Sequence, residues 1–394
     1  MAARPIPVAR PVDADDLRAI GQAAGLDRVG ITTAEPFVET QVVLERRRAR
    51  GLHGGMQFTY RNPARSTDPR RTLAGASTLV VGVRAYPATE PAPPDTGGPF
   101  ARVARYAAVD HYAELRRGLD AIAEHLRAEG WQARVIADDN ALVDRAAAHR
   151  AGVGWFGKNA NVLVDGFGSS VVIGSVLTDA PVPADAVVAD GCGTCARCLD
   201  ACPTGALVEP GVLDARRCLA WLVQAEGVFP PEHRVALGDR LYGCDDCQDA
   251  CPPTIRFGRR ATVPEAPVGS TWVPVLDVLR ATDDELLVAH GRWYIPRREP
   301  RYLRRNALIV LGNAAEVPVT DAVVAVLATA LADDDAIVRA HAVWAARRLG
   351  ADHLVTALTR DDDPLVLAEL ARAVPSRAGS PSDRTAHVSP GASC

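Results

Sequence analysis

Four cysteines lie within residues 192–202 of this 394-residue chain. Cys192, Cys195, Cys198 and Cys202 follow the pattern C-x2-C-x2-C-x3-C-P, in which a proline comes directly after the last thiol. With this spacing, three thiolates wrap one [4Fe–4S] cluster, and the fourth reaches a second cluster. The pattern therefore predicts iron–sulfur clusters and one-electron chemistry.

A second group of cysteines follows farther along the chain. Three of them lie in the sequence YGCDDCQDACP at residues 242–252, and Cys218 stands alone between the two groups. Because the thiol before the proline reaches the other cluster, we expect two crossed ligand sets. One set is Cys192, Cys195, Cys198 and Cys251; the other is Cys202, Cys218, Cys244 and Cys247. Cys218 would supply the third thiol that the second motif lacks.

Two structural zinc sites are the alternative interpretation, because zinc sites also use paired C-x2-C steps. The full pattern with its x3 step and proline is rare in zinc sites and favours iron–sulfur clusters. Two adjacent clusters form a one-electron relay. We therefore expect the rest of the chain to hold the acceptor of those electrons.

The composition is that of a globular protein with two or three domains. Hydrophobic residues make up 48% of the chain and charged residues 23%, which suffices for sizeable cores. The net charge of −4 means that binding to nucleic acid would need a local basic patch. No apolar run is as long as a membrane span, and the N-terminus lacks the features of an export signal. We expect a cytoplasmic protein, whose clustered cysteines bind metal rather than form disulfides.

The first half of the chain alternates between helical and strand-like patterns. Apolar residues recur with helical periodicity over residues 13–26, 110–130 and 142–152. Strands are expected at residues 27–34, 77–86, 132–139 and 169–179. This alternation predicts an α/β or α+β domain around one sheet over residues 1–185. The domain with the cysteine motifs would follow over residues 186–260.

Strand-like patterns stop near residue 280, and a similar sequence pattern occurs twice in the last part of the chain. Ala/Leu-rich helices are expected at residues 304–312 and 339–347, and acidic turns precede apolar segments at residues 333–338 and 361–366. An acidic turn followed by an apolar helix is typical of HEAT-type repeats, which we expect over residues 261–375. The small, polar tail at residues 376–394 is expected to be disordered, with Cys394 as a free thiol.

The stretch DDNALVDRAAAHRAGVGWFGKNANVL at residues 138–163 resembles a block of the epoxyqueuosine reductase family. AGVGWFGKN (151–159), CPTGAL (202–207) and LYGCDDCQDACP (241–252) are specific matches, and the resemblance runs from about residue 13 to residue 374. It implies reduction of epoxyqueuosine to queuosine at the wobble position of tRNA, the last step of queuosine biosynthesis. It also implies base-off cobalamin in the N-terminal domain, which two [4Fe–4S] clusters supply with electrons. The enzyme would be a monomer that takes electrons from a donor such as flavodoxin or ferredoxin.

The chemistry of epoxide removal needs two electrons and a proton for the departing oxygen, and the proton calls for a positioned acid. The family's acid is an aspartate at the end of a strand, seven residues before an arginine. Asp138 lies seven residues before Arg145, so the resemblance implies that Asp138 is the proton donor. Without the resemblance, Asp138 could equally be a turn or cap residue.

Asp139 stands where the family pattern has a small polar residue, so it is the alternative proton donor. Two adjacent carboxylates could raise the pKa of one of them if both face the pocket. On a strand, however, they would face opposite sides.

No motif in the sequence establishes the cobalamin site. The D-x-H-x-x-G signature of His-on binding is absent, because none of the nine histidines has an aspartate two residues before it. This agrees with a base-off or His-off mode. The resemblance implies five corrin-pocket positions, of which the apolar ones could also be ordinary core residues: Arg65, Asp138, Val162, Ile173 and Ala220.

The glycines at positions 152, 154 and 157 could let the backbone approach a large, flat cofactor. Glycine turns are common, so this signal is weak by itself. Lys158 could contact a propionamide or a phosphate of the cofactor, or it could be an ordinary surface residue.

A run of arginines and aromatic residues, HGRWYIPRREPRYLRRN at residues 290–306, could form an RNA-binding surface. Arginine pairs with phosphate, and aromatic rings stack on unpaired bases. The alternative is the outer face of a repeat helix, with the aromatic residues in the core. Together with the resemblance, the run predicts that tRNA contacts Arg297, Arg298, Arg304 and Arg305.

Two other functions are the alternatives. A respiratory reductive dehalogenase shares the cobalamin and the clusters, but it usually carries a twin-arginine export signal and lacks helical repeats, whereas this chain shows the opposite. A ferredoxin-like electron-transfer protein would not explain the block at residues 138–163, and it predicts iron without cobalt.

Overall fold

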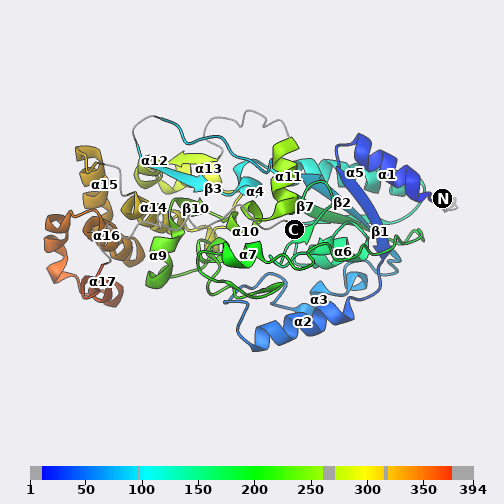
Figure 1. The fold of residues 1–394 in the computed structure, drawn as a ribbon, viewed down its shortest axis with the longest axis horizontal. Coiled ribbons are helices and arrows are strands. Elements are labelled where there is room, and N and C mark those ends of the chain that lie inside the picture. The colour runs from blue at the N-terminus through cyan, green and yellow to red at the C-terminus, as the bar shows by residue number, and fades with distance from the viewer. Residues whose placement is uncertain (1–10, 96–97, 261–270, 315–317, 375–394) are drawn as a thin grey trace, which may run out of the picture.

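The computed structural model describes residues 11–95, 98–260, 271–314 and 318–374. The N-terminal part is built on a four-stranded sheet in the order β1–β2–β7–β4 (Figure 1). Every neighbouring pair in this sheet is antiparallel, so this part is α+β. The predicted strands are confirmed as β1 (Arg28–Thr33), β2 (Thr78–Ala85), β4 (Ala133–Ala137) and β7 (Val171–Thr178).

Helices cover both faces of this sheet because its central strands carry apolar side chains on both faces. On one face lie α1 (Ala14–Ala23) and α5 (His111–Ala128), whose Leu119 packs against β2 and β7. A Cβ on Gly82 or Gly174 would come 2.8 Å from Leu119, so the glycines let α5 pack closely on the sheet. On the other face lies α6 (Asp144–Arg150), with α2 (Val38–Ala49) and α3 (Pro63–Ser66) beyond it (Figure 1).

The loop after β4 turns at Asp138. The strand ends at Ala137, and Asp138 has a φ of 53°, in the left-handed region. Asp139 Oδ1 then accepts a hydrogen bond from the N–H of Ala141 at 2.8 Å. The expectation that the two carboxylates face opposite sides of a strand is therefore wrong, because both lie in a turn before α6.

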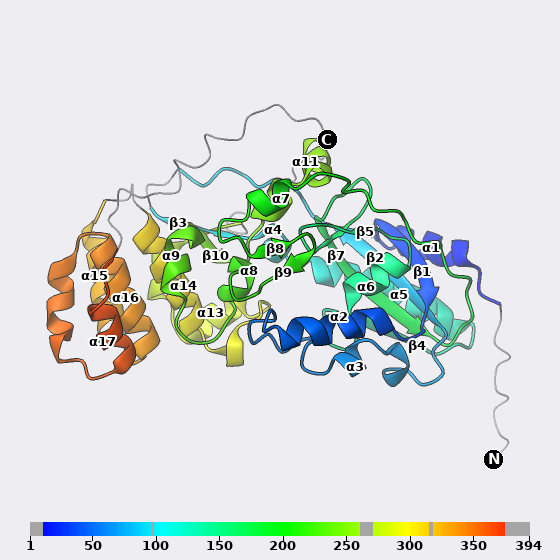
Figure 2. The ribbon, with the colours of Figure 1, turned by 60° about the horizontal axis from the view of Figure 1, so that its bottom comes forward.

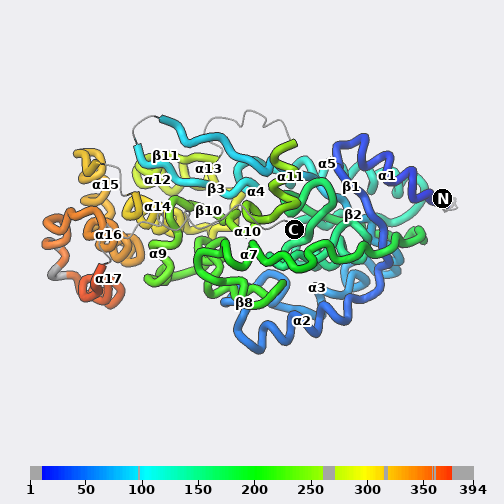
Figure 3. The backbone as a smooth tube through the Cα atoms, in the orientation of Figure 1, coloured from blue at the N-terminus to red at the C-terminus, as the bar shows by residue number. Residues whose placement is uncertain are grey.

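Short elements make up the middle of the molecule. A three-stranded sheet in the order β10–β3–β11 joins segments far apart in the sequence. Figure 3 shows the chain after β7 running back along the sheet to α7, and Asp185 on this segment accepts the N–H of Ile31 at 2.8 Å. The strands are β3 (Phe100–Val103), β5 (Trp155–Phe156), β6 (Val162–Leu163), β8 (Leu207–Glu209), β9 (Val212–Leu213), β10 (Arg240–Tyr242) and β11 (Trp272–Pro274).

Several further short helices lie in the first 260 residues, and α7, α10 and α11 among them carry or flank the cysteine motifs. They are η1 (Pro69–Arg71), α4 (Arg105–Ala108), α7 (Arg197–Asp200), α8 (Leu219–Leu222), α9 (Pro231–Leu237), α10 (Asp246–Asp249) and α11 (Pro252–Arg260). α10 packs against both α7 and α11. This packing brings the two cysteine motifs together.

The C-terminal part is helical, as predicted, and β11 is the last strand of the described residues. One apolar core runs through these helices and includes Leu219 and Phe229, so they pack on the segment between the two cysteine motifs. The helices are α12 (Val275–Arg280), α13 (Asp283–His290), η2 (Pro296–Arg298), α14 (Arg301–Asn313), α15 (Asp321–Leu331), α16 (Ala336–Arg348), η3 (Asp352–Arg360) and α17 (Pro364–Leu370).

The tail at residues 376–394, with Cys394, lies outside the described residues. In the parts of the chain that the structure describes, no helix has the length and apolar character needed to cross a bilayer.

Candidate iron–sulfur and proton-donor site

The seven cysteines of the two motifs and Cys218 fall into two groups by the electrostatic repulsion among their thiolates. Cys198 is repelled most by Cys251, and Cys251 in turn is repelled by Cys192 and Cys195. The other group is seen at Cys247, which is repelled by Cys244, Cys218 and Cys202. These groups have the same members as the two crossed ligand sets. Their binding to clusters stays a prediction, and the grouping supports it.

Burial disfavours the charged thiolate form of several of these cysteines and raises their pKa, whereas nearby backbone N–H groups stabilise the thiolate and lower the pKa. Burial, followed by the charges of Cys251 and Cys192, raises the pKa of Cys198 to about 11. Burial also raises the pKa of Cys218, whereas the backbone N–H groups of Trp221 and Ala220 donate toward its sulfur and lower it. Hydrogen bonds of this kind stabilise thiolates bound to a cluster and tune its reduction potential.

The geometry of the cysteines differs from that of a site for one ion. Within the described residues, no three His, Cys, Asp or Glu side chains come close enough together to hold a single metal ion. The thiolates of a cubane each bind a different iron atom, so they stand farther apart than the ligands of one zinc ion, which share a single centre.

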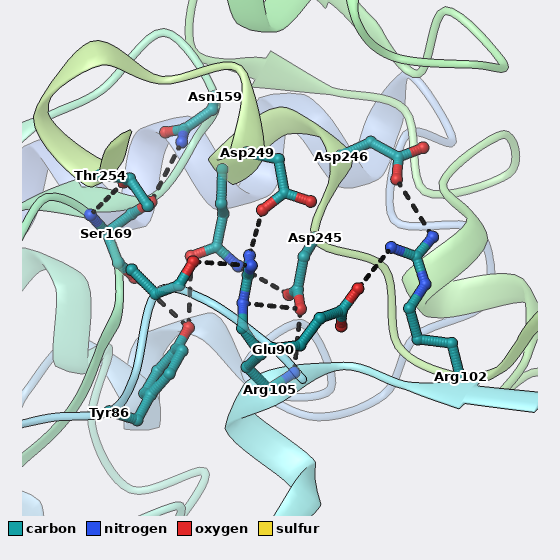
Figure 4. Close-up of polar contacts among 12 residues, drawn as sticks. Tyr86, Glu90, Arg102, Arg105, Asn159, Ser169, Asp245, Asp246, Asp249 and Thr254 are labelled. Carbon is teal, nitrogen blue, oxygen red and sulfur yellow. Dashed lines mark hydrogen bonds and ion pairs between the residues drawn. The ribbon is translucent and has the colours of Figure 1, made fainter. Parts of the chain in front are cut away.

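A buried arginine holds the second cysteine motif in place (Figure 4). Arg105 is 6% exposed, and its backbone N–H donates to Asp245 Oδ2 at 2.9 Å. Its guanidinium donates to the carbonyl oxygen of Ala88 at 2.8 Å and to Asp249. Both aspartates lie between cysteines of the second motif, so Arg105 ties that motif to the chain after β2.

The other polar side chains of the same motif also bond away from the sulfurs. Tyr86 donates its hydroxyl to Gln248 Oε1 at 3.2 Å, and Arg240 donates to both oxygens of Asp246 at 2.6 and 2.8 Å. The residues between Cys244 and Cys251 therefore serve to anchor the loop. Sequence analysis missed this network, because Arg105 and Tyr86 lie far from the motif in the sequence.

Asp138 is accessible to solvent at the end of the sheet. Its pKa is raised chiefly because the surrounding protein desolvates the carboxylate; Arg116 partly opposes this effect and the charge of Asp139 adds to it. A raised pKa keeps the carboxyl protonated at higher pH, as a proton donor needs. The structure thus places Asp138 where it could serve as an acid.

Asp144, which sequence analysis did not single out, interacts with the charge of Asp138. Burial and then that charge raise the pKa of Asp144 well above its usual range. Its Oδ1 is buried and has no hydrogen-bond partner among the described residues. The pKa of Tyr112 is also raised, chiefly by burial and further by the charges of Asp138 and Asp144. The only sequence signal for Asp144 is its position next to Arg145 in the block that begins at Asp138.

The five predicted corrin-pocket positions lie on separate elements. Val162 and Ile173 are 2% and 8% exposed and belong to one apolar cluster with α6. Arg65 is exposed on α3, and Ala220 is partly buried on α8. The N–H of Ala220 donates toward the sulfur of Cys218, so it is not free for a corrin. Contact of these positions with cobalamin stays a prediction.

The glycines of AGVGWFGK serve close packing within the protein. A Cβ on Gly152 would lie 2.3 Å from the carbonyl oxygen of Ala186, and one on Gly154 would lie 2.2 Å from that of Leu163. A Cβ on Gly157 would be 3.0 Å from Leu163. The idea that these glycines open the backbone to a flat cofactor is therefore wrong, because their own chain occupies the space.

The same block packs against the first cysteine loop. Lys158 donates its Nζ proton to the carbonyl oxygen of Gly193 at 2.7 Å. A Cβ on Gly191 would lie 2.7 Å from the ring of Trp155. Lys158 thus has a structural partner in the loop, and the block that carries the family resemblance supports the first cysteine motif.

The predicted RNA surface is corrected at Arg305. This side chain is fully buried, and its guanidinium donates to four backbone carbonyls at 2.6 to 3.1 Å, those of Ala225, Gly227, Leu222 and Val223. It cannot contact RNA, because it fixes the segment after α8. Trp293 and Tyr302 are also buried, so these aromatic residues belong to the core.

The other three arginines of the predicted surface differ in how far their guanidinium groups are bonded within the protein. Arg304 donates to Asp283 and to the carbonyl oxygen of Ala281, so much of its capacity is used within the protein. Arg297 is exposed and, among the described residues, forms its ion pair with Glu226 on the surface. Arg298 donates to the carbonyl oxygen of Gly291 at 3.0 Å. Arg297 and Arg298 remain the predicted tRNA contacts.

An α+β domain joined to paired cysteine motifs, with an acid at the sheet end, defines a class of iron–sulfur oxidoreductases. Residues 191–254 match the family described as the 4Fe-4S double cluster binding domain. The chain is 35% identical over 356 residues to the epoxyqueuosine reductase of Xanthomonas campestris pv. campestris, which covers 87% of this chain and 99% of that protein. The chain belongs to the epoxyqueuosine reductase family and is an oxidoreductase.

Solved structures agree with this family. One is an epoxyqueuosine reductase with an epoxyqueuosine-modified tRNA stem loop; it has a TM-score of 0.82 and 29% identity, over 90% of this chain and 96% of that one. Another, from Bacillus subtilis, is described with its catalytic aspartate loop swung out of the active site; it has a TM-score of 0.81 and 28% identity, over 90% of this chain and 96% of that one.

Proposed function

We propose that this protein reduces epoxyqueuosine in tRNA to queuosine, the last step of queuosine biosynthesis, with electrons that two [4Fe–4S] clusters relay to cobalamin. The net reaction consumes two electrons and two protons and releases the epoxide oxygen as water. The observation that carries this proposal is the division of eight thiols into two groups. The similar proteins are named epoxyqueuosine reductases, and the structure of one of them was solved with an epoxyqueuosine-modified tRNA stem loop.

We propose that cobalamin binds beside the face of the sheet that α6 covers. Ser175, on the same face of β7 as Ile173, has a buried Oγ without a partner in the described residues, as does Asp144 Oδ1. Such atoms could bond to the amides that rim a corrin. Together with these, the holding positions would be Arg65, Asp138, Val162, Ile173 and Ala220. When bound in its base-off form, cobalamin supplies nucleophilic chemistry at carbon and stores the electrons from the clusters.

Asp138 is the proposed proton donor for the departing oxygen. Its side chain is accessible to a substrate, and desolvation raises its pKa. It lies on a loop after a strand, and the B. subtilis relative is described with its catalytic aspartate loop swung out of the active site. Asp139 is a weaker candidate, because its Oδ1 already caps the turn by accepting the N–H of Ala141.

The helical part completes the proposal. We assign residues 1–185 to the cobalamin domain, 186–260 to the cluster domain and 261–375 to HEAT-like repeats. Arg297 and Arg298 on η2 would contact tRNA phosphates. The protein would act in the cytoplasm as a monomer and take its electrons from a carrier such as flavodoxin or ferredoxin.

The test of this function compares Asp138→Asn with Asp139→Asn in anaerobic protein. Both variants should carry about eight iron atoms per chain and should bind cobalamin. In single turnovers with reduced enzyme and epoxyqueuosine-modified tRNA, Asp138→Asn should slow deoxygenation by about 10²–10⁴, the usual contribution of a positioned acid. Asp139→Asn should stay close to the parent rate. Normal turnover by Asp138→Asn together with failure of Asp139→Asn would move the acid by one position, and stoichiometric zinc in place of iron would overturn the proposal.

A further inference from the structure

We propose that the surface formed by α7 and α11 is the docking site for a one-electron carrier protein that presents an acidic face. This inference rests on the electron relay proposed above and names the place where electrons enter it. Three independent features of the described residues support it: the exposure of the first cysteine loop, the free arginines of α11 and the position of both on the molecule.

The loop around the first cysteine group lies at the surface, whereas most residues around Cys244 and Cys247 of the second group are buried. Residues 193–194 and 196–197, between and beside the cysteines of the first loop, are exposed. Around the second group, Tyr242, Asp245 and Gln248 are each less than 9% exposed. A protein donor can therefore approach the loop at residues 193–197 more closely than the segment around Cys244 and Cys247.

The helix α11 presents uncompensated positive charge beside that loop. It begins directly after Cys251, which belongs to the first thiol group. Arg256, Arg259 and Arg260 are exposed on it, and none has an ion pair or side-chain hydrogen bond with a described residue. Acidic residues outnumber basic ones in this chain, 48 to 44. Three exposed arginines on one short helix, without an ion pair to a described residue, are thus available to an outside partner.

The position of this surface leaves the substrate side free. Figure 2 shows α7 and α11 at the top edge of the molecule, and α2, α3 and α13 at the bottom edge. Arg65 lies on α3, and η2 with its predicted tRNA contacts follows α13. A carrier on α7 and α11 and a tRNA on the opposite edge can therefore bind at the same time.

The chemistry selects an acidic redox protein as the partner. Each cluster accepts one electron at a time, so the reaction needs two deliveries. Encounters for electron transfer use small, short-lived interfaces, in which complementary charge raises the association rate more than the affinity. Arginines beside the exposed cluster loop supply that charge. RNA would also be attracted to arginines, so the experiment must separate the two partners.

The test is the double variant Arg256→Glu/Arg259→Glu, with Arg46→Glu/Arg117→Glu as the matched control. The control arginines are also exposed, have no ion pair or side-chain hydrogen bond with a described residue and give the same change in net charge. Stopped-flow bleaching of the clusters by reduced flavodoxin should be slower by about tenfold or more in the α11 variant at low ionic strength. The difference should shrink at high salt. The control variant and the conservative Arg256→Lys/Arg259→Lys variant should reduce at the parent rate.

Two further measurements separate this inference from the proposed function. With dithionite as the reductant, the α11 variant should deoxygenate modified tRNA at the parent rate, because dithionite needs no docking surface. Absence of that activity in the parent protein would overturn the proposed function, while cluster bleaching by flavodoxin would still test the docking site. Unchanged bleaching by flavodoxin overturns the docking site. Weakened tRNA binding with unchanged bleaching overturns it as well, because the surface would then bind RNA.

Discussion

Asp138 shows how one residue acquires its function from its surroundings. The residue types around it indicate a turn or a cap as readily as an acid, and only the family resemblance distinguishes them. The structure adds the left-handed backbone at Asp138 and the desolvation that raises its pKa. Neither could be predicted from the local sequence, because Arg116 and Tyr112, which share its surroundings, come from a different helix.

The pH dependence of the reaction should follow this raised pKa. An acid works only in its protonated form, so the single-turnover rate should be highest at low pH and should fall as the pH rises through the pKa of Asp138. Because that pKa is raised, the fall should begin at a higher pH than for an ordinary aspartate. The pH profile of deoxygenation by chemically reduced enzyme measures this. In Asp138→Asn this fall of the rate with rising pH should disappear. An unchanged pH profile in that variant would assign the titration to another group.

Arg305 is a residue whose role the sequence suggested wrongly. It lies among arginines that resemble an RNA surface, yet burial lowers its pKa to about 9 and its bonds go to backbone carbonyls. Arg305→Ala should lower the unfolding free energy by about 3 kcal/mol or more, because several buried carbonyls would lose their donors. Arg297→Ala, which removes an exposed side chain, should change it by about 0.5 kcal/mol or less. Denaturant unfolding followed by circular dichroism compares the two, and equal midpoints would contradict this account.

At the scale of elements, periodicity and spacing predicted most of what the structure contains. The strands at 77–86 and 169–179 and the helix at 110–130 are confirmed within a few residues, because apolar patterns report burial on a sheet or helix face directly. The pairing of β3 with β10 and β11 could not be predicted. Those strands are only a few residues long, and their partners lie more than a hundred residues away.

The crossed cysteine groups give a prediction that depends on the packing of α7, α10 and α11. Cys251 interacts with Cys192 and Cys195, although it follows Cys247 in the sequence. Cys251→Ala should therefore damage the cluster of the first loop and leave the other with its four thiols. Cys247→Ala should do the reverse. Electron paramagnetic resonance of the reduced proteins distinguishes the two clusters, and damage by Cys251→Ala to the cluster of Cys244 and Cys247 would show that the sets are sequential.

At the scale of the whole molecule, the helical part and the segment between the cysteine motifs share one apolar core. Ion pairs reinforce this contact. Arg234 on α9 donates to Glu369 on α17 at 2.7 Å, and both side chains are almost fully buried. The sequence predicted the helices but not their packing on the segment between the cysteine motifs, because the sequence does not distinguish a buried arginine from an exposed one. The C-terminal helices therefore hold the segment that carries Cys218.

We expect tRNA binding to depend on the exposed arginines of the predicted surface and not on those whose guanidinium groups are bonded within the protein. Replacement of Arg297 and Arg298 together by alanine should weaken tRNA binding and reduce the slope of log affinity against log salt by about one for each phosphate that the protein no longer neutralises. Arg304→Ala should have little effect, because Asp283 and Ala281 already occupy its guanidinium. Binding measured at several salt concentrations provides the test. If Arg304→Ala weakens binding as much as the double replacement, the contacts lie along α14 instead.

The interleaving of the two thiol groups also governs how the protein can be made. Each group draws members from both motifs, since Cys251 joins Cys192 and Cys202 joins Cys247. During synthesis, the first motif leaves the ribosome well before the second, with its last thiols uncommitted. With the proposed ligand sets, neither cubane could be completed until the second motif has emerged, so iron and sulfide would be delivered to a chain that is already well advanced. Oxygen that reaches the waiting thiols in that interval would oxidise members of both groups, so such damage should lower the yield of both clusters.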